Sequence, residues 1–182
     1  MENLKAESWI YNMDGEMISH HASEVDVAPY SNEFCHCIRE SNHKDLSEVH
    51  FLKMELSKGD GVISENFYWR SNKGQDYTAL DKLPEVNLNG NAHLENNGRQ
   101  MMLTVELQNP TDYVVFFNRL RVVGNQSGEN ILPIFYDDNY FTLLPNEKKT
   151  VDITFDRNDL NGESPRLMLE GWNADSKELG IE

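Results

Sequence analysis

Residues 76–84 read Asp-Tyr-Thr-Ala-Leu-Asp-Lys-Leu-Pro and separate two runs of strand-like sequence. They follow the polar stretch 71–75, Ser-Asn-Lys-Gly-Gln, and end at a proline. This composition is typical of a linker rather than of a buried strand. We therefore predict an all-β chain of two tandem β-sandwich modules. The expected boundaries are 1–72 for the first module, 73–83 for the linker, 84–173 for the second module and 174–182 for a C-terminal tail.

The first module contains one clear hairpin. Residues 49–56 alternate so that Leu52, Met54 and Leu56 share a face, residues 58–61 (Lys-Gly-Asp-Gly) form a turn, and residues 62–69 return. Further strands are expected at 6–13, 17–27 and 34–38. This gives about five strands, whereas an immunoglobulin-like sandwich has about seven. We expect the module to be incomplete on its N-terminal side, with an unpaired edge near residues 6–13 that promotes dimers.

The second module has about seven expected strands with turn residues between them. Met101, Leu103, Val105 and Leu107 alternate with more polar residues, which predicts a half-buried strand. Regularly spaced strands without helical periods indicate an antiparallel immunoglobulin-like β-sandwich. The strands are expected at 86–94, 101–107, 113–123, 131–136, 140–144, 151–155 and 167–172.

The charge balance restricts the expected partners. The chain has 31 acidic and 16 basic residues and a net charge of -15, so it should repel nucleic acid and anionic membranes. No apolar run approaches the ~20 residues that span a bilayer. Residues 1–5 lack the apolar core of a signal peptide, although a signal could lie elsewhere in a longer protein.

No metal or cofactor site is expected. Cys35 and Cys37 are expected on a strand as buried small hydrophobes, with His36 on the opposite face, so the three side chains should not converge on one ion. The other histidines, including His20, His21, His43 and His50, are expected at the surface or at a sheet edge. The run 137–139, Asp-Asp-Asn, could bind calcium, but a turn in which these residues bond backbone groups explains it as well. No pair of carboxylates stands out as catalytic.

Exposed aromatic rings are the candidate binding residues, because such rings stack on the apolar faces of sugars. Packing between the sheets is the alternative for each ring. A coplanar exposed platform would favour sugar binding, and rings buried between the sheets would favour a structural role. The candidates for carbohydrate contact are Tyr68, Trp69, Tyr136, Tyr140 and Trp172.

Several blocks of sequence resemble the C-terminal region of glycoside hydrolase family 2 enzymes, of the exo-β-D-glucosaminidase and β-mannosidase type. They cover nearly the whole chain in the same order. In the first half they are 49–56 (VHFLKMEL), 66–71 (NFYWRS) and 76–84 (DYTALDKLP). In the second half they are 116–120 (FFNRL), 131–133 (ILP), 136–145 (YDDNYFTLLP) and 170–173 (EGWN).

The resemblance implies a parent enzyme with a catalytic (β/α)8 barrel, followed by two immunoglobulin-like domains that this chain represents. Family members retain configuration with two barrel glutamates, so no catalytic residue is expected in this chain. The chain would be a structural accessory that packs against the barrel, in a parent typically exported from a bacterium. The alternatives are a carbohydrate-binding module for chitosan or mannan and a free-standing adhesion sandwich.

Overall fold

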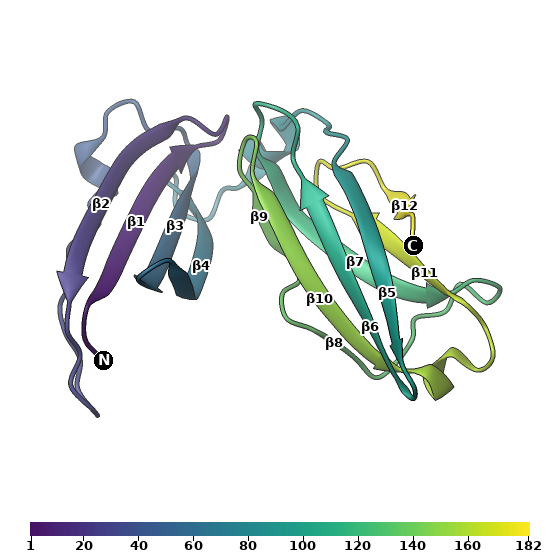
Figure 1. The fold of residues 1–182 in the computed structure, drawn as a ribbon. Coiled ribbons are helices and arrows are strands. Elements are labelled where there is room, and N and C mark those ends of the chain that lie inside the picture. Colours follow the sequence, from purple (N-terminus) through teal and green to yellow (C-terminus); the bar gives the residue numbers. More distant parts are fainter. The chain divides into compact units, whose positions relative to one another are not determined.

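The computed structural model describes residues 1–182 and contains twelve β-strands with three short 3-10 helices (Figure 1). All paired strands within the sheets are antiparallel. The all-β prediction is therefore confirmed. The chain divides into two units, Met1–Leu83 and Pro84–Glu182. No helix is long and apolar enough to cross a membrane.

The first unit is one four-stranded sheet in the order β2-β1-β3-β4. The β3–β4 hairpin confirms the prediction from the alternation of residues 49–56, and its turn holds Gly59 at a φ of 58°. A left-handed backbone of this kind favours glycine. The strands are β1 (Leu4–Asn12), β2 (Met17–Val25), β3 (Val49–Lys58) and β4 (Gly61–Ser71). The unit thus contains one of the two sheets that make a sandwich.

The unpaired edge was predicted at the wrong strand. β1, which contains most of residues 6–13, pairs with β2 on one side and with β3 on the other. The edge strands of this sheet are β2 and β4. The pattern of β1 could not show this, because a strand with neighbours on both sides and an edge strand can share the same alternation.

The predicted strand at residues 34–38 is absent. Residues 26–39 form no regular element, and this long connection between β2 and β3 packs instead on the sheet. The Nε2 atom of His36 lies 2.8 Å from the Ser8 hydroxyl and its Nδ1 lies 3.0 Å from the Ser23 hydroxyl. Cys37 is exposed and Cys35 is half-buried, so the prediction of two buried thiols is wrong. The reason is that the segment is held by side-chain bonds rather than by a strand ladder.

His50 is an exception among the histidines expected at the surface or at a sheet edge. It is 1% exposed, not at the surface as predicted, and its Nε2 atom lies 3.6 Å from a carboxylate oxygen of Glu40. Glu40 begins the first 3-10 helix, η1 (Glu40–Asn42), within the same connection. The first unit therefore buries His50 beneath the β2–β3 connection.

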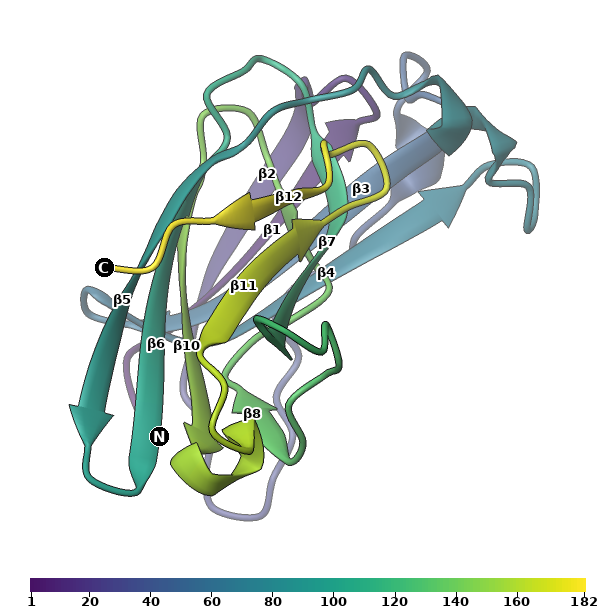
Figure 2. The ribbon, with the colours of Figure 1, turned by 90° about the vertical axis from the view of Figure 1, so that its right-hand side faces the viewer.

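The second unit is a sandwich of two four-stranded sheets, β5-β6-β10-β8 and β12-β11-β7-β9 (Figures 1 and 2). The first sheet contains β5 (Asn89–Asn97), β6 (Gln100–Gln108), β8 (Ile134–Tyr136) and β10 (Lys148–Asp156). The second contains β7 (Val115–Gly124), β9 (Phe141–Leu143), β11 (Pro165–Glu170) and β12 (Lys177–Leu179). The two remaining 3-10 helices of the chain are η2 (Thr78–Lys82) and η3 (Arg157–Leu160).

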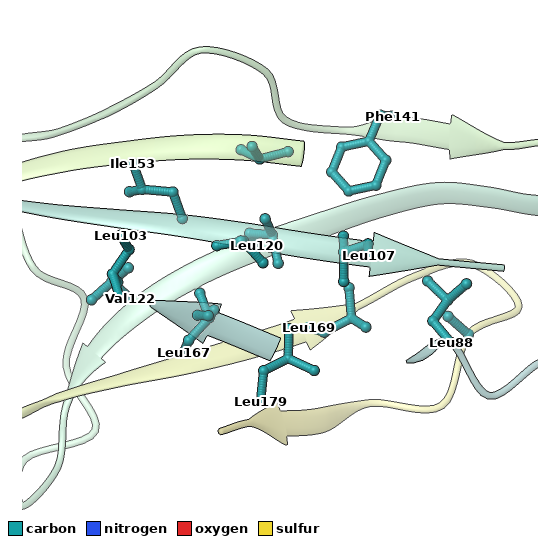
Figure 3. Packing of buried hydrophobic residues seen from close by; sticks show 14 of the residues in the cluster. Leu88, Leu103, Leu107, Leu120, Val122, Phe141, Ile153, Leu167, Leu169 and Leu179 are labelled. Carbon is teal, nitrogen blue, oxygen red and sulfur yellow. The ribbon is translucent and has the colours of Figure 1, made fainter. Parts of the chain in front are cut away.

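The core of the second unit lies between these sheets. Met101, Leu103, Val105 and Leu107 of β6 are all at most 4% exposed, as their alternation predicted. Figure 3 shows the core leucines of β6 and those of β7 and β11 gathered in one cluster. Burial of such a side chain stabilises a fold by roughly 1.5–3 kcal/mol.

Residues 174–182, expected as a separate tail, take part in the sandwich. β12 pairs with β11, and Leu179 is 2% exposed. Beyond β12, the Ala92 N–H donates to the carbonyl of Gly180 at 3.0 Å, and the Glu182 N–H donates to the carbonyl of Ala92 at 2.9 Å. The last residues thus bond to β11 of one sheet and to β5 of the other. In the predicted linker 73–83, Leu80 on η2 is 4% exposed, so that segment is also partly packed.

Candidate functional site

Four aromatic rings form a continuous cluster on the second unit. We call Phe116, Phe117, Tyr140 and Trp172 the β7 aromatic cluster. The Phe116 and Phe117 ring centroids are 5.6 Å apart, Phe117 and Tyr140 are 5.3 Å apart, and Phe116 meets Trp172 edge to face at 6.3 Å. Spacings of this size are typical of interacting aromatic pairs.

An irregularity in β7 brings the two phenylalanines together. The pairing of β7 with β9 shifts register between Val115 and Asn118, and Phe117 has a φ of 54°. In a regular strand, neighbouring side chains point to opposite faces. A left-handed backbone at a bulky residue costs on the order of 1–3 kcal/mol, so the surrounding contacts must hold it in place.

Asn173 supplies one of these contacts. Its side-chain oxygen accepts from the Phe116 N–H at 2.8 Å. Its amide donates to the carbonyls of Pro84 at 2.8 Å and Val114 at 2.9 Å. Asn173 is 7% exposed, and its side-chain bonds add to the backbone bond that the Trp172 N–H donates to the Phe116 carbonyl at 3.0 Å. It therefore fixes both Phe116 and the neighbouring Trp172.

Two further asparagines fix the other end of the cluster. Asn118 is fully buried, and its amide donates to the carbonyls of Val115 at 2.9 Å and Phe141 at 3.2 Å. Asn139 accepts from the Leu120 N–H at 2.9 Å and donates to the Leu120 carbonyl at 3.0 Å. These bonds connect β7 to the segment that carries Tyr140.

Gly171 leaves the room that this arrangement requires. A Cβ atom at this position would lie 2.6 Å from the Asn118 side-chain oxygen and 2.7 Å from the Ala174 Cβ. Both distances are far below normal contact. In the sequence Gly-Trp-Asn at 171–173, Gly171 therefore allows close packing, Trp172 supplies an exposed ring, and the Asn173 side chain anchors the backbone.

The outer rings of the cluster are open to solvent. Tyr140 is 51% exposed and Trp172 is 55% exposed, whereas Phe116 is 3% exposed. The three contacting ring pairs are inclined by 33°, 68° and 43°, so the rings do not form a flat platform. The exposed rings therefore form an uneven apolar surface, and the backbone beneath them is held by the asparagine hydrogen bonds.

Of the five candidate aromatics, the structure places Tyr140 and Trp172 in this cluster. Tyr68 and Trp69 lie in the first unit, where they are consecutive on β4 and so point to opposite faces of the sheet. Both are exposed, at 45% and 39%. They do not form one binding face with each other.

Tyr136 on β8 packs against the core of the second unit, and burial raises the pKa of its hydroxyl. The following run 137–139 bonds within the chain, as the turn interpretation predicted. The Asp137 carboxylate accepts from the Asp152 N–H at 2.9 Å, and Asp138 pairs with Lys149 at 2.7 Å. No group of three or more His, Cys, Asp or Glu residues in the chain has a geometry that could hold a metal ion.

Phe116 and Phe117 were not among the candidates. Their sequence, Phe-Phe-Asn-Arg, lies in an apolar run that predicts an ordinary strand. The sequence nevertheless held a signal of an irregular strand. Two consecutive side chains of a regular strand point to opposite faces of the sheet, so two neighbouring large rings cannot both face the core. The bulge that resolves this conflict depends on Asn139 and Asn173, which lie 22 and 56 residues beyond Phe117 in the sequence.

Glu170 and two arginines lie next to the cluster on β7 and β11. The Arg121 guanidinium donates to the Glu170 carboxylate at 2.7 Å, and the Arg119 Nε atom lies 3.5 Å from the same group. All three side chains are partly exposed, and such pairs contribute little to stability. They place charged groups beside an apolar surface, and protein–protein contacts commonly combine an apolar centre with a polar rim.

The sandwich and its aromatic cluster define an immunoglobulin-like β-sandwich module. Residues 66–174 match the sequence profile described as the exo-beta-D-glucosaminidase Ig-fold domain. The chain belongs to this family. The match begins within β4 and includes every residue of the β7 aromatic cluster.

The chain is similar to parts of much larger proteins. It is 25% identical over 187 residues to an exo-beta-D-glucosaminidase of Arthroderma benhamiae, which covers 92% of this chain and 20% of that protein. It is also 25% identical over 198 residues to a mannosylglycoprotein endo-beta-mannosidase of Lilium longiflorum, covering 76% of this chain and 21% of that protein. The chain thus spans about one fifth of the length of these relatives.

A solved structure shows the same fold. The crystal structure of an exo-chitosanase from Amycolatopsis orientalis superposes with a TM-score of 0.81 at 21% identity, over 98% of this chain and 24% of that one. The comparisons confirm the resemblance to the immunoglobulin-like domains of family 2 glycosidases. The relatives are glycoside hydrolases, and the matched domain is the non-catalytic immunoglobulin-like part.

Proposed function

We propose that the chain is a non-catalytic structural accessory region of a multidomain family 2 glycosidase. The parent enzyme is of the exo-β-D-glucosaminidase or β-mannosidase type and acts on chains that contain glucosamine or mannose. The two relatives named for these activities are about five times longer than the aligned region, which supports a parent with further domains. The remaining domains, above all the catalytic barrel, are the proposed partners.

The β7 aromatic cluster is the observation that carries this proposal. Tyr140 and Trp172 are half-exposed, yet the backbone beneath them is fixed by buried asparagines and a close contact at Gly171. Tryptophan and tyrosine, held rigidly in apolar surroundings, are the residues that contribute most to protein interfaces. The inclined rings fit a shaped protein surface better than the flat face of a sugar. We therefore assign the cluster as the docking surface for the parent enzyme's other domains.

The chemistry of the parent then resides outside this chain. A retaining glycosidase needs two carboxyl groups about 5 Å apart on either side of the scissile bond, one as nucleophile and one as acid and base. In a (β/α)8 barrel, such groups lie at the C-terminal ends of the strands. The accessory region would hold the barrel and its loops in place, and so preserve the shape of the substrate cleft.

The test uses the full-length enzyme that carries this chain. Trp172→Ala and Tyr140→Ala should lower the midpoint of thermal unfolding and expose the segment between the two units to limited proteolysis. Phe135→Ala is the matched control, because it removes another exposed ring of the same unit, 68% exposed, outside the cluster. If the cluster variants and the control behave alike, the cluster does not form the docking surface.

Carbohydrate binding is the second candidate function, because Tyr140 and Trp172 expose half of their surface. An NMR titration of the 182-residue chain with glucosamine and mannose oligosaccharides tests it. Shifts localised on Trp172 and Tyr140 would establish a sugar-binding module and overturn the docking role of the cluster. Unchanged signals of these residues at millimolar sugar would contradict carbohydrate binding by the cluster.

A further inference from the structure

A hollow lies on the second unit, outside the β7 aromatic cluster. It has a volume of about 520 Å³ and is lined by residues of β8, η3, the end of β10 and the start of β6. This volume is within the range of small-molecule sites in proteins. The residues that matter for recognition are Arg99, Gln100, Phe135, Thr154, Asp156 and Asp159.

Phe135 forms the apolar wall of this hollow. It is 68% exposed, while its neighbours Ile134 and Tyr136 pack against the core. The alternation of a strand therefore directs Phe135 to the outer face of the sheet. Its partner across the β8–β10 pairing is Thr154, which brings a hydroxyl beside the ring. An aromatic ring with an adjacent hydroxyl can hold the apolar face and the hydroxyl groups of one sugar.

The carboxylates of Asp156 and Asp159 also line the hollow, and they differ in their hydrogen bonds and ion pairs within the chain. Asp156 accepts from the Asn158 N–H at 2.9 Å at the start of η3 and pairs with the Arg99 guanidinium. The Asn158 N–H and then Arg99 lower the pKa of Asp156, so it is negatively charged near neutral pH. Asp159 lies one residue beyond Asn158, and its carboxylate forms no hydrogen bond or ion pair within the chain. Asp159 is therefore available to a cation.

The charge of the chain favours a cationic ligand. The net charge is -15, and residues 84–182 contain twice as many acidic as basic side chains. A field of this sign attracts a cation and repels an anion. Arg99, the one basic residue of the hollow, is already paired with Asp156. A protonated amine is accordingly the charged group that the hollow fits.

We propose that this hollow binds a sugar unit with a free amino group, such as one glucosamine residue of a partly or fully deacetylated chain. The apolar face of the ring stacks on Phe135, and the ammonium group pairs with Asp159. Thr154 and Gln100 supply hydrogen bonds to the hydroxyl groups. The choice of glucosamine rests on the proposed function, because it takes the sugar from the proposed activity of the parent enzyme.

The test is an NMR titration of the 182-residue chain with a glucosamine tetramer at low salt and mildly acidic pH. Shifts are expected at the backbone amides of Gln100, Thr154 and residues 156–159. The fully N-acetylated tetramer, which has the same length but no charge, should bind at least about tenfold more weakly, because it cannot pair with Asp159. Added salt should weaken the binding of the charged tetramer.

Variants locate the site. Phe135→Ala and Asp159→Asn should each reduce affinity about tenfold, consistent with the loss of one ring or one charge contact. Tyr113→Ala, which removes another exposed ring of the same unit, 49% exposed, is the matched control and should leave affinity unchanged. Phe135→Leu keeps apolar volume without the ring, so it should also weaken binding if stacking is the cause.

Three results would overturn the proposal: shifts that fall elsewhere or are absent, equal binding of both tetramers, or full affinity in Phe135→Ala and Asp159→Asn. These results are separable from a failure of the docking role. Docking is tested by Trp172→Ala and Tyr140→Ala in the full-length enzyme, where Phe135→Ala is the control. Loss of glucosamine binding in Phe135→Ala with intact docking would support both proposals together.

Discussion

Replacing Asn173 by alanine should unfold the second unit at a lower denaturant concentration, because one side chain holds three backbone groups. Its oxygen accepts from Phe116 N–H, and its amide donates to the carbonyls of Pro84 and Val114, all at 2.8–2.9 Å. The residue is 7% exposed, so water reaches these groups poorly once the side chain is removed. A buried polar group without a partner costs about 1–3 kcal/mol.

The loss in free energy of unfolding depends on how many of the three backbone groups stay without a hydrogen-bond partner in Asn173→Ala. If local relaxation admits water to one of them, two remain, and the free energy of unfolding falls by about 2–6 kcal/mol. For a unit of about one hundred residues, each 1 kcal/mol corresponds to about 4–8 °C in the unfolding midpoint. Asn173→Ala should therefore lower that midpoint by more than about 8 °C.

The assay needs a signal specific to the second unit. The chain has three tryptophans, Trp9, Trp69 and Trp172, and only the last lies in this unit. In a Trp9→Phe, Trp69→Phe background, urea unfolding followed by Trp172 fluorescence reports on the second unit alone. Asn97→Ala, an exposed asparagine on β5, provides the baseline.

A second substitution separates hydrogen bonding from size. Asn173→Asp keeps the shape and can still accept from the Phe116 N–H, but its carboxylate cannot donate to the two carbonyls and faces them with like polarity. It should be at least as destabilising as Asn173→Ala at neutral pH. If Asn173→Asp were as stable as the wild type, or if Asn173→Ala matched Asn97→Ala, the anchoring role of this residue would be refuted.

Three further outcomes are expected. Gly171→Ala should lower the free energy of unfolding by about 1–3 kcal/mol because its Cβ has no room, whereas Gly180→Ala, which meets no atom within 4 Å, should not; urea titration compares them. The Ser127 N–H and then the Gln126 N–H lower the pKa of Glu163, so its charge stabilises the fold above its ordinary pKa of 4.5. That stability is lost as pH falls through the lowered pKa, and in acid titrations Glu163→Gln should lose less stability than the wild type. The free edges of the first sheet, β2 and β4, should promote dimers, and sedimentation showing only monomers up to high concentration would argue against this.

The local pattern predicted those elements whose partners are close in sequence. The β3–β4 hairpin followed from the alternation of residues 49–56 and a glycine turn, and both features act over a few residues. The same holds for the buried face of β6, where burial on one side of a sheet dictates an apolar residue at every second position. Residues 34–38 gave a misleading pattern, because a short apolar stretch fits an irregular connection packed on a sheet as well as it fits a strand.

The candidate site was predictable only in part. Trp172 and Tyr140 stood out as aromatic residues among turn signals, but nothing local distinguished them from Tyr136, which packs against the core. Phe116 and Phe117 were hidden in a run that predicts a regular strand. Their placement depends on a bulge, and a bulge depends on contacts that lie far along the chain.

The sequence by itself determined the fold class and the buried face of β6, because these follow from composition and from the twofold period of a strand. Only the tertiary structure decided which strands are edges, that residues 177–182 close the sandwich, and that four rings meet around β7. Each of these depends on pairing between segments distant in sequence, where a backbone or asparagine side-chain bond is available only after the sheets have assembled.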